Sequence, residues 1–370
     1  MSILHINLNY SQSSLYEQLS LHLIGNGCNI NVFYPAIKGS EMGSVPSFLD
    51  QKVILNRYDR FFYNFRNKKI IKFMEKTYKL KKYKLLHAHS LFSNGNIAYT
   101  LHKKYKIPYI VAVRDTDINL FFKKMIHLRN KGIRILNNAE KIIFLSKSYK
   151  QKVLNNYVPE YLQKPFEKKI KIIPNGIDPF WLENKSLSKF KNNKITILSV
   201  GAINKRKNAL TTARACQLFK EKYKLNVELI LIGKIMDQKY FNKVKSYTFV
   251  KHIDFINKNE LINYYRKADL FVLPSITETF GLVYAEAMSQ GLPVLYSANE
   301  GFDQQFEDGK VGYPVNKYDI QDIAEKMYKA LQNRGSLSEN CIKLVDKFSW
   351  DQISKEYIQI YENVLKNVGL

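Results

Sequence analysis

Short apolar runs alternate with longer amphipathic runs along the first half of the chain. Apolar runs at 2–8 and 29–35 flank the amphipathic stretch 14–24, which Gly25 and Gly27 close with a turn. Short apolar runs predict buried strands, whereas apolar positions that recur with the helical period predict helices. The order strand, helix, strand is typical of the βαβ units of a parallel sheet.

This alternation continues and then begins again. Further apolar runs of the first series lie at 84–90, 107–113 and 141–146, and a second series lies at 195–201, 227–233, 268–275 and 292–298. The polar stretch 182–194 between them is typical of an interdomain linker. We therefore expect an α/β protein with two similar domains, at residues 1–180 and 181–352.

The last segment, 353–370, has apolar residues at helical spacing, namely Ile353, Tyr357, Ile360 and Val364. Such spacing predicts a helix with one apolar face that packs against another element.

Length and composition agree with a folded protein. The chain has 370 residues, of which 45% are hydrophobic and 24% charged, and this balance excludes extended disorder. The charge is 58 − 32 = +26. Two interpretations stay open: a field that attracts nucleic acid, an anionic membrane or acidic small molecules, or lysines spread over solvated faces.

Targeting signals are missing from the pattern. The three scattered cysteines predict a reducing compartment, and the start MSILHINLNY lacks the features of a signal peptide. No apolar run reaches the roughly 18 residues that cross a bilayer. A cytoplasmic location is expected, with a peripheral position on the inner face of the membrane as an open alternative.

The segment ETFGLVYAEAMSQGLPV, residues 278–294, places two glutamates around a predicted crossover helix at 280–290. Ligands of parallel sheets bind beyond the carboxyl ends of the strands, where Glu278 would lie. The helix start at Gly281 offers N–H groups and the positive end of the helix dipole to a phosphate, and Glu286 could accept hydrogen bonds from ligand hydroxyls. A phosphate between two such carboxylates indicates a nucleotide sugar.

Four segments together resemble the retaining glycosyltransferases of family 4, which have the GT-B fold of two Rossmann-like domains facing across a cleft. The most specific is VLPSITETFGLVYAEAMSQGLPVL, and the others are IIPNGID, SVGAINKRKNAL and FSWDQISKEYIQIY. The resemblance covers nearly the whole chain. It implies an acceptor-binding first domain, a donor-binding second domain, and a last helix that crosses back to the first domain.

The resemblance also implies roles for single residues. Glu286 would hold the ribose hydroxyls and Glu278 the sugar hydroxyls, while Lys207 would neutralise the leaving phosphate. The resemblance implies six further donor-site residues, namely Phe280, Gly281, Leu282, Arg206, Asn175 and Gly176. Fixed cations and helix amides stabilise a departing diphosphate, so neither a bound metal nor a cofactor is expected.

Two positions depart from the family pattern. Ala202 stands where an arginine usually follows the loop glycine, and Arg206, or Lys205, would supply the missing charge. Arg114, in RDTD, stands where a histidine usually faces the donor sugar. An arginine there would grip a carboxylate or the diphosphate, as a catalytic residue, or would hold the loop by pairing with a neighbouring aspartate.

Two further features allow more than one interpretation. His87 and His89 lie on one side of a predicted strand, as zinc ligands would, but the sequence shows no third ligand nearby, which favours packing. The lysine-rich helix within 67–84 has Ile70 and Met74 on its apolar face, and it would lie on an anionic bilayer or pack against its own sheet.

The sequence thus predicts a retaining transfer of sugar from a UDP- or GDP-linked donor to a saccharide or glycolipid acceptor, in cell-surface polysaccharide or glycolipid synthesis. A GT-B epimerase, a phosphorylase and an inactive GT-B scaffold are the alternatives on the same fold. From another class, a basic nucleic-acid-binding protein is a further alternative. A nucleic-acid partner is nevertheless not expected, because the aromatic residues lie in core-like strands rather than among the basic residues.

Overall fold

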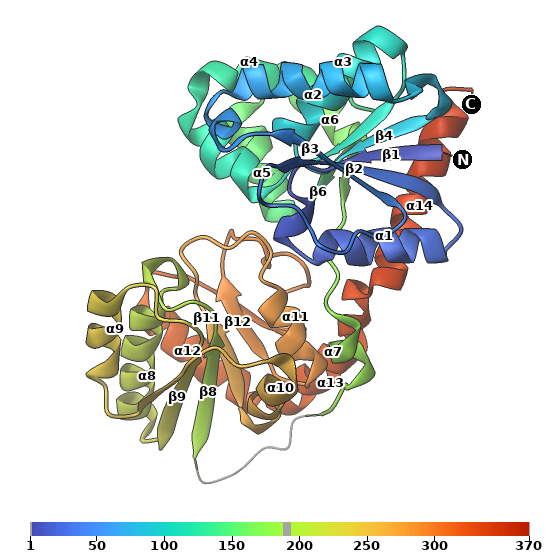
Figure 1. The fold of residues 1–370 in the computed structure, drawn as a ribbon. Helices are drawn as coiled ribbons and strands as arrows, with labels where there is room; N and C mark the ends of the chain where they lie inside the picture. Colours follow the sequence, from blue (N-terminus) through green and yellow to red (C-terminus); the bar gives the residue numbers. More distant parts are fainter. Residues whose placement is uncertain (1, 188–193, 370) are drawn as a thin grey trace. The chain divides into compact units, whose positions relative to one another are not determined.

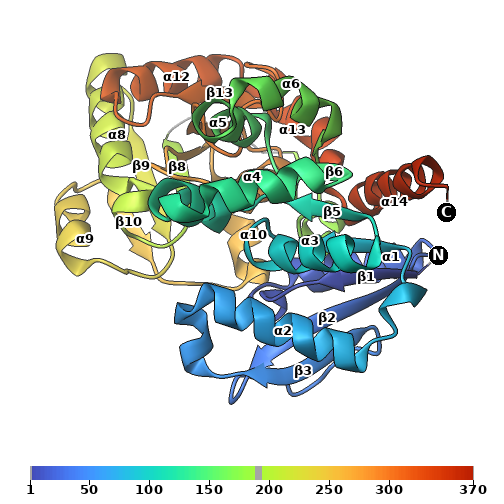
Figure 2. The same ribbon diagram turned by 90° about the horizontal axis from the view of Figure 1, so that it is seen from above.

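The computed structural model describes residues 2–187 and 194–369, apart from the side chain of Arg60. The chain divides into two compact units. Unit 1 comprises Met1–Leu145, Lys150–Pro174 and Trp350–Leu370, and unit 2 comprises Ser146–Tyr149 and Asn175–Ser349. Each unit is a parallel sheet covered by helices (Figures 1 and 2).

The sheet of unit 1 has seven strands in the order β3-β2-β1-β4-β5-β6-β7, and all neighbours are parallel. The strands are β1 (Ser2–Ile6), β2 (Asn29–Ile37), β3 (Leu49–Leu55), β4 (Leu85–Ala88), β5 (Tyr109–Ala112), β6 (Lys141–Phe144) and β7 (Ile170–Ile172). The central strands are apolar and buried, because helices cover both faces.

Two helices of unit 1 pack on one face of this sheet, and the other face carries α2, α3 and α4 (Figure 1). The first pair is α1 (Leu15–Gly25) with the C-terminal α14 (Trp350–Asn367). The other helices are α2 (Tyr63–Thr77), α3 (Ser93–Tyr105), α4 (Arg129–Asn138), α5 (Lys147–Tyr157) and α6 (Glu160–Lys169), with a π-helical turn η4 (Asp117–Phe122) and short 3₁₀ helices η1 (Tyr10–Gln12), η2 (Arg57–Phe61), η3 (Leu80–Lys82) and η5 (Ile126–Leu128).

The sheet of unit 2 has six parallel strands in the order β10-β9-β8-β11-β12-β13. The strands are β8 (Ile195–Val200), β9 (Val227–Ile232), β10 (Val250–Ile253), β11 (Leu270–Leu273), β12 (Val294–Ser297) and β13 (Gly312–Val315). The helices are α7 (Pro179–Glu183), α8 (Ala209–Tyr223), α9 (Gln238–Lys245), α10 (Lys258–Lys267), α11 (Leu282–Ser289), α12 (Ile320–Gln332) and α13 (Arg334–Leu344), with η6 (Lys205–Lys207) and η7 (Val345–Phe348).

Both sheets reverse their strand order at the first strand. In unit 1 the reversal lies between β1 and β4, and in unit 2 it lies between β8 and β11. Loops that leave the carboxyl ends of such a pair diverge to opposite faces of the sheet and leave a crevice in which ligands bind. Each unit therefore has one position at which a ligand site is expected.

The chain passes from unit 1 to unit 2 between Pro174 and Asn175. Residues 175–187 belong to unit 2, where Trp181 of α7 is buried with its ring 5.5 Å from that of Tyr265. The polar stretch expected to link the domains therefore begins inside unit 2, because α7 anchors it there, and its residues 188–193 lie outside the described part. Among the described helices, none is long and apolar enough to cross a membrane.

Candidate active site

The loops that follow β8 and β11 meet at the switch point of unit 2. Asn204 caps η6 by accepting a hydrogen bond from the N–H of Lys207 at 3.0 Å. This cap directs the Lys207 side chain to the β11 loop, where its Nζ lies 2.5 Å from a carboxylate oxygen of Glu278. The hydroxyl of Ser275 donates to the same oxygen at 3.3 Å.

The Lys207–Glu278 pair is shielded but not closed off from solvent. The two side chains are 14% and 9% exposed, so an approaching ligand can reach them without unfolding of the loops. A lysine and a carboxylate held side by side present one cation and one hydrogen-bond acceptor to the same volume.

Arg206 adds a second cation next to this pair. Its guanidinium donates to the carbonyl of Thr277 at 3.1 Å, and its own carbonyl accepts the N–H of Ile276 at 2.8 Å. The side chain is exposed. The two loops are thus joined along their length, with both basic side chains on the β11 loop.

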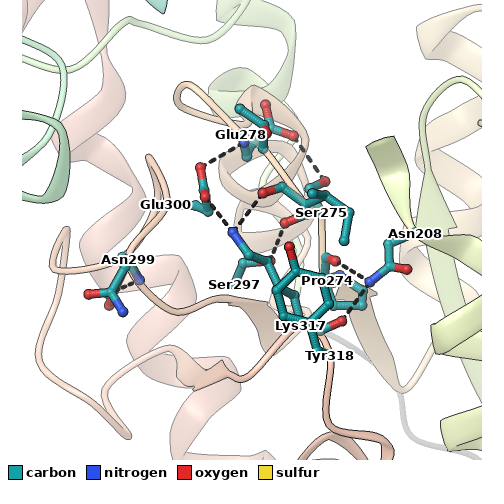
Figure 3. A network of polar contacts seen from close by, with 12 residues as sticks. Asn208, Pro274, Ser275, Glu278, Ser297, Asn299, Glu300, Lys317 and Tyr318 are labelled. Atoms are coloured by element: carbon teal, nitrogen blue, oxygen red, sulfur yellow. Dashed lines mark hydrogen bonds and ion pairs between the residues drawn. The ribbon is translucent and has the colours of Figure 1, made fainter. Parts of the chain in front are cut away.

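A second buried ion pair supports Glu278 from behind (Figure 3). Glu300, 4% exposed, accepts the N–H of Glu278 at 3.1 Å and lies 2.5 Å from Nζ of Lys317. Lys317 also donates to the carbonyl of Ile276 at 2.6 Å. Figure 3 shows Asn208 on the other side of the loop, where its amide donates to the carbonyls of Pro274 and Lys317.

These supporting residues were not identified from the sequence. Glu300 follows β12 as Glu278 follows β11, so its position after a predicted strand was the available signal. Asn208 and Lys317 had no such signal, because their hydrogen-bond partners are distant in the sequence. The partners of Asn208 lie 66 and 109 residues away, and those of Lys317 lie 17 and 41 residues away.

The helix α11 begins at Leu282, one residue after the predicted start at Gly281, and its first turn lies beside Glu278. Gly281 is in the left-handed region, with φ of 76°, and a Cβ on it would lie 2.4 Å from the ring of Tyr284. The side chain of Phe280 is buried with its ring 5.5 Å from that of Phe348, so only its main chain can serve a ligand. The N–H of Tyr284 donates to the carbonyl of Gly281 at 3.0 Å, whereas the N–H groups of Leu282 and Val283, in the first turn, have no partner within the helix.

Glu286 lies in the second turn of α11 and is partly buried. The hydroxyl of Tyr265 donates to its carboxylate at 3.1 Å. Burial raises the pKa of Glu286 to about 7, against the opposing effect of the Tyr265 hydrogen bond. A carboxyl with this pKa exchanges its proton near neutral pH.

Asn175 and Gly176 open unit 2. The next residue, Ile177, donates its N–H to the carbonyl of Phe348 at 3.0 Å, and Phe348 in turn packs on Phe280. It is thus Ile177, the neighbour of the two predicted residues, that connects through Phe348 to the segment before α11.

Arg114 belongs to unit 1, after β5. Its Nε donates to the carbonyl of His89 at 3.3 Å, and its guanidinium acts on Tyr357 of α14 as a charge and a hydrogen-bond partner that lowers the pKa of a phenol otherwise raised by burial. Its main-chain N–H donates to Asp117 at 2.9 Å.

Asp117 holds the loop after β5 together. Its carboxylate also accepts the N–H groups of Leu91 and Phe92 at 2.9 and 3.0 Å. Burial raises the pKa of Asp117 to about 6, and the three main-chain hydrogen bonds oppose the increase. Asp117, the second aspartate of the RDTD segment, thus holds the loop by accepting main-chain hydrogen bonds, which the sequence analysis did not anticipate.

The two histidines of the HAH segment have a third partner after all. His5 of β1 is paired in register with His87 of β4, and its Nδ1 lies 3.1 Å from Nε2 of His89. The sequence showed no third imidazole nearby because 82 residues separate His5 from His87. The sheet brings the two together, since β1 and β4 are neighbours.

The arrangement in unit 2 is suited to a ligand that carries both a phosphate and hydroxyl groups. Lys207, Arg206 and the start of α11 provide positive charge and N–H donors, while Glu278 and Glu286 provide acceptors.

Comparison with known proteins agrees with this chemistry. The family model described as Glycosyl transferases group 1 matches residues 182–348, and the one described as Glycosyltransferase Family 4 matches residues 13–180. An uncharacterized glycosyltransferase of Methanocaldococcus jannaschii is 27% identical over 314 residues, which are 78% of this chain and 77% of the relative. An alpha-monoglucosyldiacylglycerol synthase of Acholeplasma laidlawii is 28% identical over 294 residues, 71% of each chain.

Solved structures share the fold. Sucrose-phosphate synthase of Thermosynechococcus elongatus superposes with a TM-score of 0.77 over 99% of this chain and 100% of its own, at 18% identity. HepE of Anabaena, solved with UDP and glucose, has a TM-score of 0.67 over 98% and 100% of the two chains, at 16% identity.

Proposed function

Since this chain belongs to the glycosyltransferases of group 1 and family 4, with the GT-B fold, we propose that it transfers a sugar from a nucleoside diphosphate to a saccharide or lipid-linked acceptor with retention of configuration. The observation that carries the proposal is the Lys207–Glu278 pair beside the start of α11. Cell-surface polysaccharide or glycolipid synthesis is the proposed setting, as the relatives named for capsular polysaccharide biosynthesis and for alpha-monoglucosyldiacylglycerol synthesis suggest.

Each group of the donor has a proposed partner in unit 2. Lys207 and Arg206 take the charge of the diphosphate, together with the main-chain N–H groups of residues 280–282. Glu278 accepts from the sugar hydroxyls and Glu286 from the ribose hydroxyls. Asn175 and Gly176 are proposed to line the donor site, and the support is the bond of the next residue, Ile177, to Phe348.

The chemistry needs few groups from the protein. The bond between the anomeric carbon and the phosphate oxygen breaks, and the acceptor oxygen forms a new bond to that carbon on the same face. The acceptor proton passes to the leaving phosphate, so no separate base is required. Negative charge grows on the diphosphate during the step, and the fixed cations and helix amides stabilise it without reorganising. The proposed reaction therefore uses no metal.

The donor nucleotide is proposed to be a UDP-sugar, with a GDP-sugar as the competing case. Support comes from the likeness of the fold to HepE, whose structure contains UDP and glucose. Calorimetric titration with UDP-glucose, GDP-mannose and the free diphosphates would decide between them. Binding of none of these would contradict the proposal.

Substitution of Lys207 tests whether the Lys207–Glu278 pair takes part in the reaction. We expect Lys207→Ala to reduce turnover roughly 100- to 1,000-fold, as loss of one group that stabilises transition-state charge does elsewhere. Lys245→Ala removes an exposed lysine from α9 of the same unit and should leave turnover unchanged. Equal rates in the two variants would remove Lys207 from the mechanism.

The anomeric configuration of the product, read by NMR, tests retention of configuration. Formation of a product from the donor alone, without an acceptor, would indicate an epimerase.

Arg114 is proposed to act on the donor as a cation. Its side chain is partly exposed and is held by the carbonyl of His89 and by Tyr357. Arg114→Lys keeps the charge and Arg114→Ala removes it, so a donor role predicts activity in the order wild type, lysine, alanine. If Arg114→Ala turned over every tested donor at the wild-type rate, the donor role would be excluded and Arg114 would only hold the loop.

We propose that the protein binds its acceptor at the surface of an anionic membrane. Around η2 and the start of α2, four aromatic side chains are between 60% and 77% exposed, namely Tyr58, Phe61, Phe62 and Phe65. Exposed lysines follow on α2, while Ile70 and Met74 pack toward the sheet. Exposed aromatic rings next to basic side chains suit the interface of an anionic bilayer.

Liposome sedimentation tests this surface. We expect binding to vesicles that contain phosphatidylglycerol and little binding to phosphatidylcholine alone. Replacement of Phe61, Phe62 and Phe65 by serine should abolish the difference, whereas Tyr161→Ser, which removes an equally exposed ring from α6, should not. Equal binding by the two variants would show that lysines alone, or another surface, are responsible.

A further inference from the structure

Three buried histidines lie at the switch point of unit 1. His5 is next to last in β1, His87 is paired with it in register from β4, and His89 follows the end of β4. Their side chains are 0%, 0% and 2% exposed. The carboxyl ends of the two central strands therefore bring three imidazoles together at the position in unit 1 where a ligand is expected.

The distances suit a single metal ion. One ring nitrogen from each histidine lies within 4.8 Å of the other two, and Nδ1 of His5 and Nε2 of His89 are 3.1 Å apart. Nitrogen ligands at about 2.05 Å in a tetrahedral zinc site are about 3.3 Å from each other. The His5–His89 pair is already close to this spacing, and the ring of His87 must move before its nitrogen can reach the same ion.

The remaining ring nitrogens indicate which atoms would bind. The hydroxyl of Tyr361, on α14, lies 2.8 Å from Nδ1 of His87 and 3.4 Å from Nε2 of His5. If both rings donate to this hydroxyl oxygen, Nε2 of His87 and Nδ1 of His5 carry lone pairs that face the cluster. Among the described residues, Nε2 of His87 is buried without a hydrogen-bond partner. A partner that fixes the outer nitrogen is the usual support of a metal-binding histidine.

Two geometric and electrostatic costs accompany metal binding. The rings of His87 and His89 are stacked at 4.1 Å with an interplanar angle of 21°, so one ring must rotate before their lone pairs converge. The Arg114 guanidinium, which bonds the carbonyl of His89, opposes a dication, while the Asp117 carboxylate, bonded to the Arg114 N–H, offsets that charge. The neutral imidazole is the form that binds metal.

We propose that His5, His87 and His89 form a binding site for a divalent late transition metal, with zinc as the ion of first choice and Tyr361 as a positioning residue. Imidazole nitrogens suit zinc, and three histidines leave a fourth position for water or an anion. The ion replaces the hydrogen bond between His5 and His89, and the displaced proton moves to Nδ1 of His89, so no proton leaves the protein. The site belongs to unit 1 and rests on no part of the proposed transfer reaction.

Metal titration of the full chain, with any affinity tag removed, tests this inference. Protein stripped with a chelator is titrated with Co²⁺ while the visible absorption of the ion is followed, and then with Zn²⁺ in competition. We expect one equivalent of Co²⁺ to give the intense bands of a tetrahedral site, zinc to displace it, and zinc to raise the melting temperature. Weak octahedral absorption, or no saturation at one equivalent, would overturn the proposal.

Variants identify the ligands. His87→Ala and His5→Gln should lose the tetrahedral bands, and Tyr361→Phe should weaken binding by roughly 10- to 100-fold while keeping the bands. His127→Ala removes an exposed histidine of η5 and should bind like the wild type. If a ligand variant fails to fold, the wild-type titration and Tyr361→Phe still decide. Unchanged binding in Tyr361→Phe, or a loss in His127→Ala, would contradict the assignment.

Discussion

Glu286 combines a near-neutral pKa with a position on the helix that starts at the anion site. Burial is the main cause of its raised pKa, and Tyr265 is its direct hydrogen-bond donor. Ribose hydroxyls can donate only to lone pairs that are free, so a bound ribose favours the carboxylate over the protonated acid. The charge state of this single side chain should therefore control donor affinity.

We expect the affinity for UDP-glucose to rise about tenfold between pH 6 and pH 8, because a carboxyl with a pKa of about 7 must lose its proton before it accepts both hydroxyls. The diphosphate of this sugar ester does not titrate in that range, so calorimetry at several pH values isolates the protein group. Glu286→Gln should bind more weakly at pH 8 and show no pH dependence. Affinity that falls as the pH rises would contradict the assigned role.

Gly281 shows how one missing side chain shapes the anion site. Its φ of 76° and the 2.4 Å approach of the Tyr284 ring both exclude a Cβ. Tyr284 itself is fixed, since its hydroxyl donates to the carbonyl of Leu273 at 2.6 Å. A larger residue at 281 would thus displace either the helix start or a buried ring.

Gly281→Ala should lower the free energy of unfolding by at least about 1–2 kcal/mol, the cost of a left-handed alanine alone, and should also weaken nucleotide binding. Gly335→Ala is the matched control, because this glycine of α13 has open space around its Cβ position and should gain roughly 0.5–1 kcal/mol. Urea denaturation followed by circular dichroism measures both. A Gly281→Ala protein as stable as the wild type would mean that the helix start tolerates the change.

At the scale of elements, α14 is the best example of a helix that the pattern predicted and the tertiary structure explains. Its buried face includes Ile353, Tyr357, Ile360 and Tyr361, which join the core formed by α1 and the sheet of unit 1. Ser354 at the same face bonds to Asn26 beyond the end of α1. The helix is therefore part of the core of unit 1, although residues 175–349 of unit 2 lie between Pro174 and Trp350 in the chain.

Ile353→Ala should destabilise unit 1 by about 2–5 kcal/mol, because it leaves a cavity at a fully buried position. Lys355→Ala, on the exposed face of the same helix, should change stability by no more than about 0.5 kcal/mol. The chain has two tryptophans, and Trp350 belongs to unit 1 while Trp181 belongs to unit 2. In a Trp181→Phe background, fluorescence during urea unfolding reports on unit 1, and equal midpoints for the two variants would contradict the prediction.

At the scale of the whole molecule, the six strands of unit 2 have the same order as the first six strands of unit 1, but the chemistry at the two switch points differs. Unit 2 places charged groups there, Lys207 with Glu278, whereas unit 1 places neutral imidazoles there. An anion site and a metal site in separate units should respond separately to removal of divalent ions.

We therefore expect a chelator to leave the affinity for UDP-glucose unchanged, because the proposed donor site uses lysine, arginine and helix amides instead of a metal. The same treatment should lower the melting temperature of zinc-loaded protein through the histidines of unit 1. Calorimetry with and without EDTA, on one zinc-loaded preparation, gives both results. Donor binding that disappears with EDTA and returns with Mg²⁺ would contradict a metal-free donor site.

From the residues alone, the alternation of apolar and amphipathic runs identified the central strands, the helix after Glu278 and the apolar face of α14, because periodicity is a property of neighbours in the chain. Edge strands were missed: β3 is mostly half-buried and lacks a continuous apolar run, and β13 contains Gly312 and Pro314, which break the usual pattern.

What needed the tertiary structure were the contacts between distant segments. Lys207 meets Glu278 across 71 residues, and His5 joins His89 across 84. Strand order decides which loops share one end of a sheet, and no local pattern records that order. The residue types with the right chemistry were therefore visible in the sequence, while their grouping into sites came from the fold.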